Sequence, residues 1–258
     1  MSYPSLQEDQ VTIFQQLALE QPETWLGNIP KNWANHIDQN LGEMYDLPEK
    51  IINRHQLIEI WKSDSCSVEK AFLCTMAWGG MKLDNARRIW EKRSEVMPIC
   101  ENIRNNKYTR LEAFEVFRSM RTNNKLPGMG PAYYTKIIFF ASQLADAYIL
   151  DQWTARSIHM LTKQRSWPSV QIDHTSKKKA EKTLRYQELR VTVTDRVTSE
   201  DYEQYCKLVE ELARILKLPS HAVEERMFGK GGKSPSLWRE HLMNNWHSLP
   251  LLLGARHC

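Results

Sequence analysis

Residues 126–156 read LPGMGPAYYTKIIFFASQLADAYILDQWTAR, and this segment sets the architecture that we expect. Two glycines, Gly128 and Gly130, stand on either side of the apolar Met129, between two helical patterns. A helix should begin at Pro131, because proline lacks only an N–H that has no partner in a first helical turn. Glycines allow a left-handed backbone and expose their N–H groups, which together with the dipole of the following helix suit a DNA phosphate. Met129 would point back into the core, and a tight turn that binds no ligand is the alternative.

The composition is that of an ordinary globular protein. Of the 258 residues, 41% are hydrophobic and 26% are charged. No apolar run approaches the roughly 18 residues of a membrane helix, and the start MSYPSLQEDQ has no secretory pattern, so we expect a cytoplasmic protein without a membrane span. The five cysteines form no CxxC pair. Because zinc and iron–sulfur sites need clustered thiolates, we expect reduced, structural cysteines and no metal.

Charge is distributed unevenly along the chain. Residues 1–100 carry 10 Lys and Arg against 14 Asp and Glu, whereas residues 101–258 carry 25 against 17. A basic second part suits a polyanionic partner, although basic faces are common on soluble proteins. The basic runs at 177–182 and 230–233 would either follow phosphates or belong to solvated linkers.

Hydrophobic periodicity predicts helices along most of the chain and almost no strand, so the expected class is all-α or nearly so. The expected helices cover 8–19, 31–38, 57 onward, 66–80, 83–94, 109–122, 131 onward, 153 onward, 199–216, 220–228 and 237–248. Ser67, Asp84 and Ser220 are the expected N-caps, and the pair Gly79-Gly80 should end its helix. The alternating run RVTVTDRVT, residues 190–198, predicts a short strand or an extended loop.

The segment 126–156 resembles the helix-hairpin-helix with Gly/Pro-rich loop and aspartate of the HhH-GPD superfamily, which includes endonuclease III and the 8-oxoguanine DNA glycosylases. In that motif the apolar segment after the hairpin ends in an aspartate, and Asp151 stands at this place, 21 residues after Gly130. The resemblance covers 109–163 well and the flanking helices more loosely. Within the superfamily the chain is similar to bacterial OGG-fold proteins, some of which accompany antiphage operons.

The resemblance implies one glycosylase-like unit over 1–258, with two helical lobes and a DNA cleft between them. The helix-hairpin-helix core would span 109–163, with a looser N-terminal lobe at 1–108 and C-terminal helices at 199–248. The implied partner is duplex DNA with a damaged base that is flipped out of the stack. We expect a monomer without membrane contact, operon-encoded proteins as further partners, and no cofactor beyond a monovalent cation that the hairpin could hold.

The resemblance assigns Asp151 as the catalytic carboxylate. Cleavage of an N-glycosidic bond passes through an oxocarbenium-like sugar, and a carboxylate near C1′ stabilises that charge. Asp151 can also cap the helix that follows it, and one aspartate can serve both purposes. A purely structural cap is the alternative.

The chain departs from the family pattern at the lysine. Bifunctional members normally carry it two residues after the second glycine, where this sequence has Ala132. Lys136 stands one helical turn later on the same face, and its stem should point back toward position 132. There its amine could attack C1′ and form a Schiff base, helped by a pKa that Tyr133, Ile137 and Phe140 would lower by desolvation. The alternative is a surface lysine on an amphipathic helix, which would make the enzyme monofunctional or inactive.

Further DNA-binding residues follow from the hairpin and from the same resemblance. Gly128, Met129 and Gly130 would contact the DNA backbone. Arg156 matches an arginine of endonuclease III-like members and would either bind a phosphate or form a structural ion pair. Trp153 would line the base pocket, or else lie in the core.

The base pocket and the wedge are assigned to two other segments. In VEERMF, residues 223–228, Phe228 would stack on the flipped base and Glu224 would accept hydrogen bonds from N1–H and N2–H of a guanine edge. An ordinary helix end is the alternative. Trp78 or Met81 would fill the space that the flipped base leaves.

The expected reaction is therefore excision of oxidised guanine, with Asp151 as the carboxylate and Lys136 as the Schiff-base nucleophile of an AP lyase. Two alternatives stay open. The chain could be a DNA-binding module that kept the fold and lost the chemistry, as Ala132 suggests. It could also act on another modified base or nucleotide in phage defence.

Overall fold

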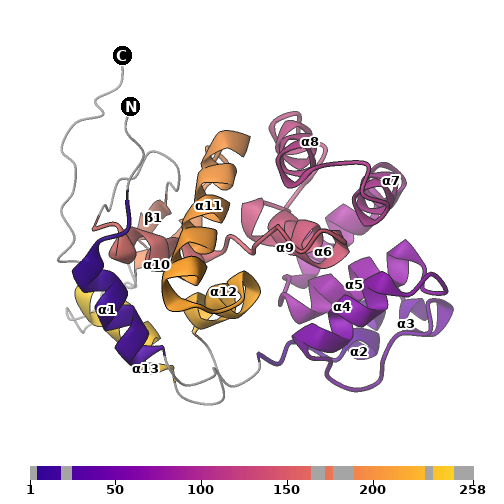
Figure 1. The fold of residues 1–258 in the computed structure, drawn as a ribbon. Coiled ribbons are helices and arrows are strands. Elements are labelled where there is room, and N and C mark those ends of the chain that lie inside the picture. The colour runs from indigo at the N-terminus through magenta and orange to yellow at the C-terminus, as the bar shows by residue number, and fades with distance from the viewer. Residues whose placement is uncertain (1–4, 19–24, 164–171, 177–188, 230–234, 247–258) are drawn as a thin grey trace.

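The structure is a computed structural model that describes residues 5–18, 25–163, 172–176, 189–229 and 235–246. These residues form a helical body, which confirms the all-α expectation (Figure 1). Its helices are α1 (Glu8–Leu17), α2 (Pro30–Asn35), α3 (Leu41–Met44), α4 (Arg54–Lys62), α5 (Val68–Trp78), α6 (Leu83–Trp90), α7 (Arg93–Arg104), α8 (Arg110–Thr122), α9 (Pro131–Ala141), α10 (Gln152–Leu161), α11 (Ser199–Leu216), α12 (Ser220–Phe228) and α13 (Leu237–Asn245).

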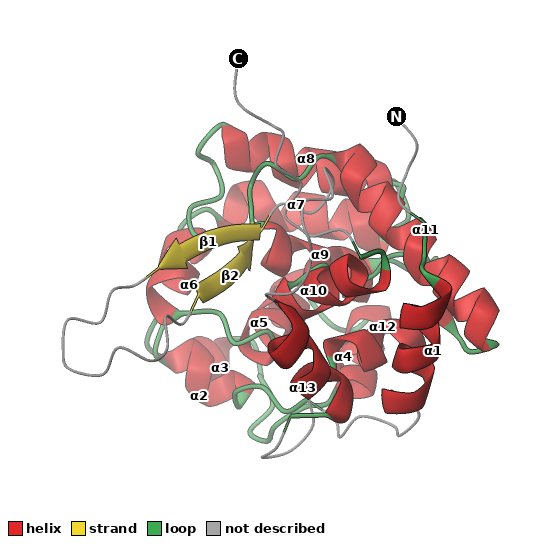
Figure 2. Cartoon of the chain, turned by 90° about the vertical axis from the view of Figure 1, so that its left-hand side faces the viewer, coloured by secondary structure: helices red, strands yellow, loops and turns green. Residues whose placement is uncertain are grey.

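Two short strands form an antiparallel hairpin on one side of the helical body (Figure 2). They are β1 (Ile172–Ser176) and β2 (Leu189–Val193), with Ile172 opposite Val193 and Ser176 opposite Leu189. The strand expected within 190–198 is therefore present only up to Val193. Strand β1 was not expected, and β2 contacts α10.

The helix starts follow the capping chemistry of the sequence in part. Ser67 caps α5, because its hydroxyl accepts a hydrogen bond from the Lys70 N–H. The other two expected caps are wrong. Helix α6 begins one residue before Asp84. Asp84 therefore lies inside the first turn, where its negative charge interacts favourably with the positive end of the helix dipole. Helix α12 begins at Ser220 itself, so Pro219 is its N-cap residue.

The expected helix at 83–94 is two helices. Helix α6 ends at Trp90, and α7 then runs from Arg93 to Arg104 with Pro98 inside it. Helix α7 was not expected from the sequence, and a proline usually breaks a helix interior. Pro98 is the sixth residue of α7 and lies beyond the first turn, so the helix forms although proline removes one of its backbone hydrogen bonds.

The N-terminal helix packs with the C-terminal end of the chain. Helix α1 contacts α10 and α13, and the ring of Phe14 meets that of Trp238 edge-on at 4.8 Å. In Figure 1, α1 and α13 lie together, on the opposite side of the molecule from α2 to α5. The first and the last described helices therefore pack in one part of the core.

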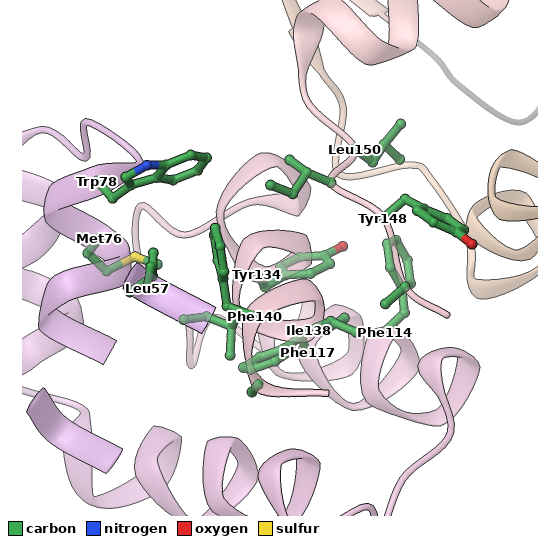
Figure 3. Packing of buried hydrophobic residues seen from close by; sticks show 14 of the residues in the cluster. Leu57, Met76, Trp78, Phe114, Phe117, Tyr134, Ile138, Phe140, Tyr148 and Leu150 are labelled. Carbon is green, nitrogen blue, oxygen red and sulfur yellow. The ribbon is translucent and has the colours of Figure 1, made fainter. Parts of the chain in front are cut away.

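Helix α9 lies at the centre of one continuous hydrophobic core (Figure 3). Tyr134 packs against Phe114 and Phe117 of α8, at 5.0 and 5.6 Å between ring centroids. Phe140 meets Trp78 of α5 edge-on at 5.0 Å. A helix that is apolar around most of its circumference is usually buried in this way. Any charge on α9 is consequently held inside the protein.

Candidate active site

Lys136 is the only charged residue of α9, and only 6% of its surface is exposed. Its ammonium donates a hydrogen bond to the Ala132 carbonyl oxygen at 2.6 Å, so the stem does point back toward position 132. The Tyr133 ring centroid lies 5.8 Å from Nζ. Gly79 makes room for the stem, because a Cβ at that position would lie 3.0 Å from Lys136 Cδ. The alternative of a surface lysine is therefore wrong.

Asp151 is the N-cap of α10 and is 7% exposed. Its Oδ1 accepts from the N–H groups of Trp153 and Thr154, at 2.8 and 3.2 Å. The Thr154 hydroxyl in return accepts from the Asp151 N–H at 2.9 Å, which completes a capping box. Oδ2 makes no hydrogen bond to any described residue. The cap thus uses one carboxylate oxygen and leaves the other for a ligand.

The amine and the carboxylate lie within electrostatic reach of each other. Burial lowers the pKa of the Lys136 amine, and the negative charges of Asp151 and Glu224 partly oppose this shift. The positive charge of Arg54 adds to the lowering. The structure therefore brings together two carboxyl groups, one lysine and one arginine that come from α4, α9, the start of α10 and α12.

Glu224 is fully buried and forms an ion pair with Arg54. The sequence analysis named Glu224 but missed Arg54. The Oε2 of Glu224 accepts from Arg54 Nη2, whereas its Oε1 has no hydrogen-bond partner. Burial raises the pKa of Glu224 to about 7, although Arg54 acts in the opposite direction. The Arg54 guanidinium lies 4.1 Å from the centroid of the Phe139 ring. A signal was present, since Arg54 stands three and seven residues before Leu57 and Trp61 on the buried face of α4.

A second buried arginine, Arg239, lies between the aromatic residues that were assigned to the base pocket. Its guanidinium is 3.8 Å from the Trp153 ring centroid and 5.3 Å from that of Phe228. Both rings are partly exposed, and Phe228 also meets Trp25 edge-on at 5.9 Å. Sequence reasoning missed Arg239 and Trp25. The position of Arg239 next to Trp238, on the inward side of α13, was the available signal.

One family model covers most of the chain. The model described as "putative 8-oxoguanine DNA glycosylase OGG-like protein" matches residues 12–228. The chain belongs to this OGG-like family. No curated protein and no solved structure matches the chain. The matched residues include Arg54, Lys136, Asp151 and Glu224, whereas Arg239 lies beyond them.

Arg156 of the OGG-like chain stacks on aromatic rings and forms no ion pair with the described residues. Its guanidinium lies 4.8 Å from the Trp153 ring centroid and 5.3 Å from that of Trp246. Burial lowers the pKa of Arg156 to about 10, and its Nε has no hydrogen-bond partner. Of the two expected roles, the structural ion pair is absent from this part of the chain.

The hairpin turn has the backbone that its glycines predict, with one correction. Gly128 has φ +76°, and a Cβ there would lie 2.5 Å from the Asn85 side chain of α6. The Met129 side chain is fully buried, and its N–H donates to the Leu126 carbonyl oxygen at 3.4 Å. The expectation that Met129 contacts DNA is therefore wrong, because both its side chain and its N–H are used inside the protein.

Gly130 completes the turn in an extended conformation, and it precedes the helix start at Pro131 as expected. The Asp195 carboxylate approaches it, since a Cβ on Gly130 would lie 3.2 Å from Asp195 Oδ1. Arg121 neutralises this carboxylate through an ion pair of 2.9 Å. Neither glycine N–H of the turn donates to a described residue.

Both wedge candidates are wrong as the structure stands. Trp78 is 3% exposed and Met81 is 2% exposed, so neither side chain can enter a DNA stack without leaving the core. The indole of Trp78 packs on Phe140, and the Met81 carbonyl oxygen accepts from Trp33 Nε1 at 3.1 Å. The two side chains that the resemblance assigned as wedges are here part of the core packing.

The remaining expectations concern metals, membranes and the basic runs. Within the described ranges no three His, Cys, Asp or Glu side chains are grouped as metal ligands, and no helix is long and apolar enough to span a bilayer. Cys66, Cys74, Cys100 and Cys206 are free thiols. The basic runs at 177–182 and 230–233 lie outside the described residues.

Proposed function

We propose that this protein is a DNA glycosylase that excises oxidised guanine from duplex DNA by base flipping. The observation that carries the proposal is the buried Lys136 amine, which the Asp151 carboxylate reaches electrostatically, in a chain of the OGG-like family. Lysine is rarely buried without a partner, and a lowered amine pKa increases the fraction of neutral nucleophile at physiological pH. The geometry supports excision followed by AP lyase chemistry.

The reaction needs a nucleophile and a stabilised sugar cation. The Lys136 nitrogen forms a bond to C1′ while the bond between C1′ and the base breaks, and the base leaves with the electron pair and takes up a proton. The free Oδ2 of Asp151 would stabilise the positive charge that develops on the sugar. One amine proton passes to the ring oxygen O4′ as the sugar ring opens, which gives a protonated Schiff base between Lys136 and C1′. Removal of a proton from C2′ then releases the 3′ phosphate by β-elimination.

Base recognition would fall to Glu224 and Phe228 of α12. The Arg54 guanidinium occupies one oxygen of Glu224 and leaves Oε1 without a partner. An ionised carboxylate is an acceptor only, so it suits N1–H and N2–H of a guanine edge. Phe228 is partly exposed on the same helix and would stack on the base.

The hairpin would hold the DNA strand, as in the wider helix-hairpin-helix superfamily, within a cleft between two lobes. The N–H groups of Gly128 and Gly130 make no hydrogen bonds to described residues, and they precede the positive end of α9. The association with phage defence stays an expectation from the resemblance.

A trapping experiment tests the proposal. A duplex with one 8-oxoguanine is incubated with protein and borohydride, which reduces a Schiff base to a stable adduct. We expect an adduct with the wild type and none with Lys136→Gln. The exposed Lys62→Gln is the matched control and should give the wild-type adduct. Excision without an adduct would overturn the role of Lys136, and binding without excision would leave only a DNA-binding module.

A further inference from the structure

Two arginines gather at the ring of Trp153. Arg156 of α10 and Arg239 of α13 lie 4.8 and 3.8 Å from the centroid of this ring. Arg239 is 6% exposed, and Arg156 is partly exposed. The pair is therefore shielded from bulk water but open on the Arg156 side.

Neither guanidinium forms an ion pair in the described chain. Arg239 donates through Nη2 to the Phe228 carbonyl oxygen at 3.0 Å, while the Nε atoms of Arg239 and Arg156 have no partner. The buried Arg54 and the partly buried Arg110, in contrast, have carboxylate partners. Arg54 is paired with Glu224, and Arg110 is paired with two carboxylates of α11.

Such a pair is costly unless an anion completes it. Burial lowers the pKa of Arg239 to about 10, and the positive charge of Arg156 adds to this, while Asp151 opposes it. Buried charges are normally paired, because the loss of hydration is otherwise uncompensated. The guanidinium groups are planar forks with several donors, and their geometry matches the oxygens of carboxylates and phosphates. Of these two anions, DNA supplies phosphates.

We propose that Arg156 and Arg239 together bind a phosphate of the nucleotide whose base is removed. The assignment rests on the proposed glycosylase function and extends it. Arg239 is electrostatically coupled to Asp151, the residue that would face C1′, and it contacts Phe228, which would stack on the base. A flipped nucleotide places its base, sugar and flanking phosphate within one such neighbourhood. The two arginines would hold the sugar still while the bond at C1′ breaks.

A binding experiment with neutral phosphates tests this proposal without any catalysis. The duplexes carry a tetrahydrofuran abasic-site analogue, in which the phosphate on its 5′ or its 3′ side is replaced by methylphosphonate. Loss of a charge-assisted hydrogen bond weakens binding on the order of tenfold or more. We expect this loss for wild-type protein at one of the two positions. Equal affinity for all three duplexes would overturn the assignment.

Arg239→Met and Arg156→Met identify the residues involved, with the exposed Arg214→Met of α11 as the control for a general loss of positive charge. Arg239→Met and Arg156→Met should each weaken binding to the abasic-analogue duplex with unmodified phosphates about tenfold. In each of these variants, the methylphosphonate that weakens binding of the wild type should have no further effect. If the fold-loss of affinity in a variant and the fold-loss from the methylphosphonate multiply, these arginines do not contact that phosphate. Because the analogue has no base, a failure of 8-oxoguanine excision leaves this result readable. The comparison of duplexes with wild-type protein also holds if a variant fails to fold.

Discussion

At the level of single residues, Glu224 combines burial, one ion pair and one unused oxygen. Its pKa is raised to about 7 by burial, so the carboxyl group changes charge within the physiological range. Below that pH the group is protonated and can no longer accept two hydrogen bonds from a guanine edge. Recognition of the base and stability of the fold therefore depend on pH in opposite directions.

We predict that affinity for an 8-oxoguanine duplex rises about tenfold from pH 6 to pH 8, as Glu224 ionises. The measurement uses Lys136→Gln protein, so that no base is excised, and fluorescence anisotropy. An added Glu224→Gln substitution should remove the pH dependence, and an undamaged duplex is the control. A pH dependence that survives Glu224→Gln would contradict the assignment.

The stability of the fold should show the opposite trend. The folded pKa of Glu224 lies above its ordinary value of 4.5, so the folded state binds more protons than the unfolded state between these values. The contribution of Glu224 is fully present below about pH 4.5 and is lost as pH rises through about 7.

Asp151 has a structural role and a proposed catalytic role, and two substitutions separate them. Asparagine is as good an N-cap as aspartate, whereas alanine costs about 1 kcal/mol. We expect Asp151→Asn to unfold in urea close to the wild type and Asp151→Ala to be less stable. Both should lose excision on the order of a hundredfold or more in single-turnover assays. Full activity of Asp151→Asn would show that the residue is only a cap.

At the level of elements, the hairpin turn depends on Gly128 for two separate reasons. Its backbone is left-handed, and the side chain of Asn85 fills the space where a Cβ would be. Gly80 offers a control for the first reason alone, since it has φ +65° and nothing within 4 Å of its Cβ position. The two glycines therefore separate backbone strain from crowding.

We predict that Gly80→Ala costs about 1 kcal/mol of unfolding free energy, because alanine disfavours the left-handed region. Gly128→Ala should cost about 1–3 kcal/mol more, because Asn85 Cβ lies 2.7 Å from the new atom and cannot simply rotate away. Urea denaturation measures both. Equal costs would show that Asn85 adapts freely.

The sequence predicted elements better than it predicted the site. The helices at 199–216, 220–228 and 109–122 follow from apolar periodicity and nearly match the structure. The cap of α10 and the inward stem of Lys136 follow from local geometry. Arg54 and Arg239 could not be linked to the site in this way, because they meet Glu224 and Trp153 through contacts between distant segments. Burial of Trp78 and Met81 likewise depends on neighbours that periodicity does not reveal.

At the level of the whole molecule, the buried pair of Arg54 and Glu224 joins residues that are 170 positions apart in the chain. It links α4 to α12, and so connects an early helix to a late one. Removing one partner of a buried pair leaves the other charge without compensation. The pair should therefore affect global stability as well as base recognition.

We predict that Arg54→Met lowers the unfolding free energy by about 3–5 kcal/mol at pH 8, and that the double variant Arg54→Met with Glu224→Met recovers most of this loss. Replacing Lys31, which pairs with Glu49 on the surface, by methionine should change stability little. Urea titrations of the wild type, Arg54→Met, Glu224→Met and the double variant give the coupling energy. Additive effects of the two core substitutions would show that the pair is not coupled in solution.

The helices that supply this site, α4, α9, α10, α12 and α13, are spread from residue 54 to residue 245. During translation the amine of Lys136 and the carboxylate of Asp151 leave the ribosome long before Glu224 and Arg239. A prematurely terminated chain would lack α12 and α13, and so the residues proposed to select and seat a nucleotide. The full set of proposed site residues therefore exists only after the last of these helices has been synthesised.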